Sequence, residues 1–157
     1  MIDFTKIFVS IFYIGYIKYA PGTWGSLASL LILFFLFNIV NISLSILIII
    51  FVFLFFLSNY LINYFSLFTH SHDSKYIVID EFLGLFLVFL FYELIYIHND
   101  FITCLLIFIS FRIFDIYKFF PANYFDKQIH SGYGVILDDI IAGMYTVLTM
   151  IIINVFI

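Results

Sequence analysis

The side chains that could do chemistry in this very apolar chain are a small set of carboxylates and bases, most of them in one stretch. Arg112, Asp115 and Lys118 recur every third residue, so on a helix they form one slowly rotating polar stripe among Ile, Phe and Tyr. Asp138 and Asp139 follow at the start of a further apolar segment. Acids and bases in this combination can bind a metal ion, an anion or both.

A second acidic pair, Asp80 and Glu81, precedes another apolar segment. Asp80 is followed four residues later by Gly84, and Asp139 is followed four residues later by Gly143. Because a glycine one helical turn below each Asp lets another backbone approach, the spacing predicts two tightly packed helices with their carboxylates close together. Any single Asp could instead be only a favourable charge at a helix N-terminus.

Carboxylates that converge need a cation, since two unit charges about 4 Å apart repel by roughly 4 kcal/mol at an effective dielectric near 20. Oxygen ligands without a group of Cys and His residues favour a hard divalent ion such as Mg²⁺ over zinc. His70 and His72 form only a weak zinc signal, and His130 is a better candidate for a loop or substrate contact than for a ligand.

Three basic residues stand among these acids, namely Arg112, Lys118 and Lys127. They either neutralise Asp115 and Asp126 as structural ion pairs or bind an anion, and an arginine offers a planar fork that matches phosphate oxygens. Carboxylates, a divalent ion and bases together are what phosphoryl transfer requires.

The stretch at residues 20–26, Ala-Pro-Gly-Thr-Trp-Gly-Ser, is a turn that leads into an apolar segment. Its backbone N–H groups and the hydroxyls of Thr23 and Ser26 suit a phosphate. The simpler interpretation is a turn in which Ser26 is the N-cap of the helix that follows.

The composition places these residues in a membrane protein. The chain has 157 residues, of which 66% are hydrophobic and 10% charged, and its mean hydropathy is +1.22. The formal net charge of −4 is spread without long runs of one sign, which gives no indication of a nucleic-acid partner. The single cysteine, Cys104, excludes an internal disulfide and lies in an apolar run.

The hydrophobic segments predict an all-α, polytopic membrane bundle of about five helices in a single domain, residues 1–157. The expected helices cover residues 27–40, 43–62, 82–97, 101–119 and 140–157. Residues 7–17 are too few to span a bilayer and predict an N-terminal core or interfacial helix, with no cleavage site of a signal peptide after them.

Five spans would bring the N-terminal arm, the loop 63–81 and the segment 112–139 to one face of the membrane. Every basic residue lies in these parts: Lys6, Lys18, Lys75, Arg112, Lys118 and Lys127. The positive-inside rule therefore predicts that this face, with its acidic cluster, is cytoplasmic.

Three blocks of the sequence match one known family in order and spacing. They are residues 20–26, residues 79–84 (Ile-Asp-Glu-Phe-Leu-Gly), and the stretch from Phe111 to Gly143 with Arg112, Asp115, Lys118, Pro121, Asp126, Gly132-Tyr133-Gly134-Val135, Asp138 and Asp139. In these blocks the chain resembles the phosphatidylglycerophosphatase A family of bacterial membrane lipid phosphatases. The resemblance implies Mg²⁺-dependent hydrolysis of the terminal phosphate of phosphatidylglycerophosphate at the bacterial inner membrane. Two departures, Phe119 where the family has Pro and Ser131 where it has Gly, remove no ionisable group.

The resemblance leaves the division of labour among the carboxylates open, and the following roles are our expectation. The expected Mg²⁺ ligands are Asp80, Glu81, Asp138 and Asp139. Asp115 is expected to activate water or act as nucleophile, and Arg112 and Lys118 to bind phosphate oxygens. Further expected substrate contacts are Thr23, Ser26, Lys127 and His130. The acyl chains of the lipid need no pocket, since they can remain in the bilayer.

A small cation transporter or channel is the main alternative, because such proteins also place acids within membrane helices. Their acids usually lie near mid-span on a path open to both sides, whereas the acids here are expected at helix ends on one face. The sequence leaves the oligomeric state open, and a homo-oligomer is compatible with it.

Overall fold

The computed structural model describes residues 2–40, 42–69 and 74–156, and the described residues form helices and no strand. The elements are α1 (Ile2–Val9), the short 3₁₀ helix η1 (Ile14–Tyr16), α2 (Pro21–Ile39), α3 (Leu44–Thr69), α4 (Ile79–Leu90), α5 (Tyr92–Ile95), α6 (Asp100–Tyr117), α7 (Ala122–Gln128) and α8 (Gly132–Phe156). The all-α prediction is confirmed.

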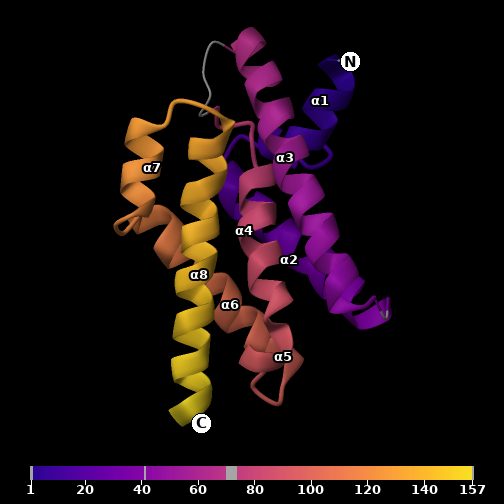
Figure 1. Ribbon diagram of the computed structural model, residues 1–157, viewed down its shortest axis with the longest axis vertical. Helices are drawn as coiled ribbons and strands as arrows, with labels where there is room; N and C mark the ends of the chain where they lie inside the picture. Colours follow the sequence, from indigo (N-terminus) through magenta and orange to yellow (C-terminus); the bar gives the residue numbers. More distant parts are fainter. Residues whose placement is uncertain (1, 41, 70–73, 157) are drawn as a thin grey trace.

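The helices form an elongated bundle with α4 at its centre. Helix α4 packs against α2, α3 and α8, and α8 also packs against α6 and α7. In Figure 1, α3 and α6 run upward while α4 and α8 run downward, and the two chain termini lie at opposite ends. The sequence of α4 is almost uniformly apolar after its first turn, so most of its surface is buried, including Phe86 and Phe89.

The backbones of α4 and α8 touch where the two glycines lie. A Cβ atom on Gly84 would be 2.5 Å from the carbonyl oxygen of Asp139, and one on Gly143 would be 2.4 Å from the carbonyl oxygen of Gly84. Real Cβ atoms essentially never come that close, so only glycine fits at both positions. The predicted close approach of these two helices is confirmed.

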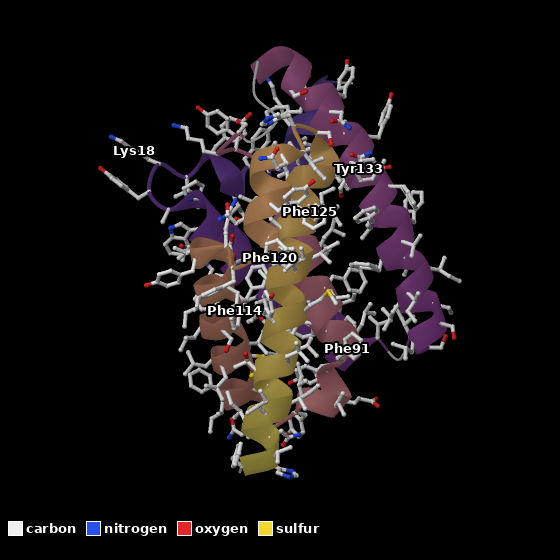
Figure 2. The ribbon with its side chains drawn as sticks, turned by 60° about the vertical axis from the view of Figure 1, so that its left-hand side comes forward. Lys18, Phe91, Phe114, Phe120, Phe125 and Tyr133 are labelled. Atoms are coloured by element: carbon white, nitrogen blue, oxygen red, sulfur yellow. The ribbon has the colours of Figure 1, made fainter. Side chains whose placement is uncertain are left out.

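Three helices are long and apolar enough to span a membrane within the described residues, and they are α2, α3 and α8. The expected number of about five is not confirmed. Helix α4 has 12 residues, roughly 18 Å of rise against a hydrocarbon core of about 30 Å. Helix α6 is long enough but carries Asp100, Arg112 and Asp115. Figure 2 shows Lys18 in the upper part of the bundle and Phe91 in the lower half, and many apolar side chains of the described residues are exposed.

Several predicted boundaries are wrong, and α8 matters most for the site. It begins at Gly132 rather than at residue 140, so Asp138 and Asp139 lie inside the helix and not at its entry. The side chain of Asn63, on α3, explains the earlier start, because its Oδ1 accepts a hydrogen bond of 2.8 Å from the Gly132 N–H. A partner distant in sequence therefore satisfies one of the free N–H groups of the first turn.

The loop predicted at 63–81 is also shorter than expected, because α3 continues to Thr69 and α4 starts at Ile79. Helix α7 lies after Pro121, between the helices predicted at residues 101–119 and 140–157. At the N-terminus, α1 occupies residues 2–9 and not 7–17. The chain then passes through left-handed backbone conformations at Ile11, Phe12 and Tyr13, which end the helix.

Candidate active site

A polar cavity of about 170 Å³ lies where the N-terminal ends of α2 and α4, the C-terminal end of α6 and the second turn of α8 meet. Its lining residues are Pro21, Gly22, Ser74, Lys75, Ile77, Asp80, Glu81, Asp115, Lys118, Val135, Asp138 and Asp139. Five of these are carboxylates and two are lysines, so the described lining has an excess of negative charge. The structure thus brings both acidic pairs and Asp115 to one place.

Three carboxylates converge within the cavity. One oxygen each from Asp80, Glu81 and Asp139 lies within 4.8 Å of the others. Oδ1 of Asp80 and Oε2 of Glu81 are buried and find no hydrogen-bond partner among the described residues. Buried polar atoms without a partner are rare in folded proteins, so these oxygens are available to a ligand that supplies positive charge.

Asp80 and Glu81 lie at the start of α4, outside the three candidate spans. Burial is the main influence on the pKa of each carboxyl group. It raises the pKa of the Asp80 carboxyl group, and the nearby Asp115 carboxylate raises it further. Burial likewise raises the pKa of Glu81 well above its usual value, and the adjacent Asp80 adds to the rise. The protein without a bound cation therefore resists full ionisation of the pair.

Gly22 leaves the space that the Glu81 carboxylate fills. A Cβ atom at Gly22 would lie 2.5 Å from Oε1 of Glu81 and 3.5 Å from Nη1 of Arg112. The glycine in the first turn of α2 therefore lets α4 and α6 bring their charged side chains against the α2 backbone.

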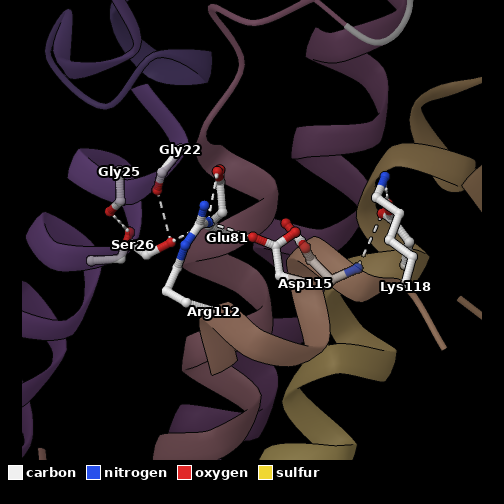
Figure 3. Close-up of polar contacts among 10 residues, drawn as sticks. Gly22, Gly25, Ser26, Glu81, Arg112, Asp115 and Lys118 are labelled. Atoms are coloured by element: carbon white, nitrogen blue, oxygen red, sulfur yellow. Dashed lines mark hydrogen bonds and ion pairs between the residues drawn. The ribbon is translucent and has the colours of Figure 1, made fainter. Parts of the chain in front are cut away.

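Arg112 is held by residues of three helices, as Figure 3 shows. Its Nη1 donates to Oγ of Ser26 on α2 at 3.1 Å and to Oδ2 of Asp115 on α6, and it lies 3.9 Å from Oε1 of Glu81 on α4. The Ser26 hydroxyl in turn donates to the Gly22 carbonyl at 2.8 Å. Of the two predicted alternatives for Arg112, the structural ion pair with Asp115 is present.

Lys118 belongs to the same cavity through a different contact. Helix α6 ends at Tyr117, and Lys118 follows in a left-handed conformation with φ 44°. Its Nζ lies 2.7 Å from Oδ2 of Asp138 on α8, and the Asp139 N–H donates to Oδ1 of the same carboxylate at 3.0 Å. Asp138 thus lines the cavity but faces a lysine, while its neighbour Asp139 joins the three converging carboxylates.

The four residues predicted as further substrate contacts are placed differently from one another. Ser26 is buried inside α2, not at its N-cap, and it contacts Arg112. Thr23 does not line the acidic cavity but lies in a neighbouring groove beside Arg112. His130 is exposed between α7 and α8 and is absent from the described lining of the cavity. The side chain of Lys127 lies outside the described residues, as do His70 and His72.

Two polar lining residues, Ser74 and Lys75, were not assigned to the site by the sequence analysis. They belong to the segment that leads into α4, six and five residues before Asp80. This closeness to Asp80 in the sequence was the only signal that they could belong to the site. Lys75 is exposed, and its Nζ lies 5.3 Å from the centre of the Tyr76 ring. It adds a second lysine to the cavity.

The fold and the cavity define a helical protein with three candidate membrane spans and a polar site of carboxylates and lysines at one end of the bundle. The chain belongs to the phosphatidylglycerophosphatase A family, whose model matches residues 7–154.

Two relatives carry the name phosphatidylglycerophosphatase A. The protein from Haemophilus influenzae is 34% identical over 136 residues, which covers 87% of this chain and 80% of the relative. The protein from Escherichia coli K12 is 37% identical over 73 residues, which covers 46% of this chain and 40% of the relative. No solved structure matches the chain significantly.

Proposed function

We propose that this protein hydrolyses the terminal phosphate of phosphatidylglycerophosphate and releases phosphatidylglycerol and inorganic phosphate. Membership of the family supports the substrate, and the names of both relatives agree with it. The observation that carries the proposal is the cavity in which converging carboxylates adjoin Lys118 and Arg112. Acids for a cation and bases for phosphate oxygens occur together there.

The donor set fits the magnesium ion that the family resemblance implies. Asp80, Glu81 and Asp139 offer oxygen atoms within 4.8 Å of one another, and two buried oxygens of this group have no partner among the described residues. These three residues would hold the ion, with Asp138 beside them. Bound there, Mg²⁺ would supply positive charge that stabilises the phosphoryl oxygens.

The chain's own residues have distinct roles in this scheme. Hydrolysis forms a bond between a water oxygen and phosphorus, and it breaks the bond from phosphorus to the glycerol oxygen, which takes up a proton as it leaves. Arg112 holds Oδ2 of Asp115, so Oδ1 is the oxygen of that cavity-lining carboxylate that accepts a proton from water. Lys118 and Lys75 line the cavity and would bind phosphate oxygens, and Ser26 fixes the position of Arg112.

The setting that we propose is the bacterial inner membrane, with the site at the cytoplasmic face. The support is the one-sided distribution of Lys and Arg together with the three candidate spans. The substrate is a glycerophospholipid of the same bilayer, so it can reach the cavity by diffusion in the membrane plane.

Phosphate release by the purified protein tests the proposal. In detergent micelles with phosphatidylglycerophosphate, we expect inorganic phosphate with Mg²⁺, none with EDTA, and recovery when Mg²⁺ is added back. Asp139→Asn keeps the size of the side chain but removes its charge, and it should lower turnover by about 100-fold, as the loss of one preorganised electrostatic group does.

Asp100→Asn is the matched control, because Asp100 lies at the opposite end of α6 and contacts Tyr92. It should keep turnover close to that of the unmodified protein. Equal rates with and without EDTA would refute the metal assignment, and the absence of phosphate under all conditions would refute the hydrolase and favour a transport function.

A further inference from the structure

An apolar groove of about 350 Å³ lies next to the cavity, between the start of α2 and the outer face of α6. Its lining residues are Thr23, Phe108, Ile109, Arg112, Ile113, Ile116 and Tyr117. Residues 108 to 117 of α6 extend along it for roughly 14 Å of helix. Ile109, Ile113 and Ile116 are exposed, so the groove opens to the surroundings of the bundle.

Arg112 connects this groove with the cavity. The residue lines the groove, while its Nη1 contacts Asp115 and lies 3.9 Å from Glu81, both of which line the cavity. Figure 3 shows the side chain rising from α6 between Ser26 and the carboxylates. A ligand whose polar end occupies the cavity can therefore continue past Arg112 into the groove.

Two of the other hollows lack this connection. One of about 370 Å³ lies beside α1 and is lined on α4 by Ile79 and Phe82, which are one turn apart on one face of the helix. Asp80 and Glu81 point away from that face, toward the cavity. The other, about 480 Å³, includes Glu93 near the opposite end of the bundle.

We propose that the groove between α2 and α6 binds one acyl chain of the lipid substrate and is the lateral entrance by which the lipid reaches the cavity. This inference rests on the proposed function. The bilayer is as apolar as the groove, so moving an acyl chain from the bilayer into the groove releases little hydrophobic free energy. Its contribution is orientation, because a chain that lies along Ile109 and Ile113 restricts where the headgroup can stand. In this proposal the protein holds one acyl chain, whereas the sequence analysis expected that the chains need no pocket.

A bulky residue in the groove tests the proposal. Ile109→Trp should lower kcat/KM for a dioleoyl substrate at least ~10-fold, chiefly through kcat, because the acyl chain no longer orients the headgroup. For the same headgroup without acyl chains, glycerophosphoglycerophosphate, kcat/KM should stay within about twofold. Leu148→Trp is the matched control, since Leu148 is 56% exposed on α8 and belongs to the described lining of neither the acidic cavity nor the groove.

Cross-linking gives a readout that does not depend on turnover. Phosphatidylglycerophosphate with a diazirine in one acyl chain, irradiated with the unmodified protein in EDTA, should label Ile109 and Ile113 more than Ile49 and Phe53 of the exposed face of α3. Equal labelling of both helices would refute the proposal that the groove binds an acyl chain. Equal effects of Ile109→Trp and Leu148→Trp would refute it as well. A protein that labels as expected but releases no phosphate would instead overturn the proposed hydrolysis.

Discussion

Gly22→Ala places a single methyl group against the charged side chains of the site. The new Cβ would lie 2.5 Å from Oε1 of Glu81, whereas ordinary contacts begin at 3.4 Å. The carboxylate is the end of a flexible side chain, so it can move, and a displacement of about 0.9 Å restores a normal contact. Arg112, at 3.5 Å from the same Cβ, need not move for the methyl group itself.

The expected consequence is a loss of turnover without a loss of folding. A misplacement of about 1 Å in a catalytic arrangement can cost 100-fold in rate, or roughly 2.7 kcal/mol of transition-state stabilisation. The fold should not suffer, because alanine is a better helix former than glycine by about 1 kcal/mol. Gly22 lies in the first turn of α2, where no left-handed backbone conformation requires a glycine.

Two measurements on the same detergent preparation check this prediction. Phosphate release should fall about 100-fold in Gly22→Ala, while the Tm stays within a few degrees of that of the unmodified protein. Glu81→Gln should give a similar loss of turnover, because it removes the charge at the same place. Leu31→Ala, at an exposed position of α2, is the control for an ordinary change in this helix. Normal turnover in Gly22→Ala would show that the position of the Glu81 carboxylate is unimportant.

The remaining predictions concern the frame of the site. Gly143→Ala should lower the free energy of unfolding by about 1–3 kcal/mol and the Tm by several degrees, because its Cβ would meet the backbone oxygen of Gly84 at 2.4 Å; an unchanged Tm would show that α4 and α8 can separate freely. In a Cys104→Ala background, Ser74→Cys and Gln128→Cys should react with impermeant thiol reagents only from the cytoplasmic side. Labelling from outside intact cells would refute the proposed orientation.

The spacing within the chain was enough to predict the central helix pair. Each Asp and the glycine four residues later, at 80 and 84 and at 139 and 143, lie one turn apart on any helix. Because this relation is local, it holds whatever the surrounding tertiary structure is. The scarcity of charge in a chain that is 66% hydrophobic likewise identified the membrane class and the few residues capable of chemistry.

Helix ends were predicted poorly, because partners distant in the sequence determine several of them. The N-cap predicted at Ser26 was wrong because α2 already starts at Pro21, and the hydroxyl contacts Arg112 instead. The start of α8 was wrong because Asn63 of α3 accepts the Gly132 N–H. A window of neighbouring residues contains no information about such contacts.

The sequence by itself determined the kinds of group in the site, since few other charged residues interrupt the apolar segments. Which group faces which was decided by the tertiary structure alone. The left-handed turn at Lys118 brings its amine to Asp138, so that Asp139 is the member of that pair that joins Asp80 and Glu81. Adjacent residues on a helix point about 100° apart, and only the packing of α8 against α4 and α6 selects which of the two carboxylates enters the cluster.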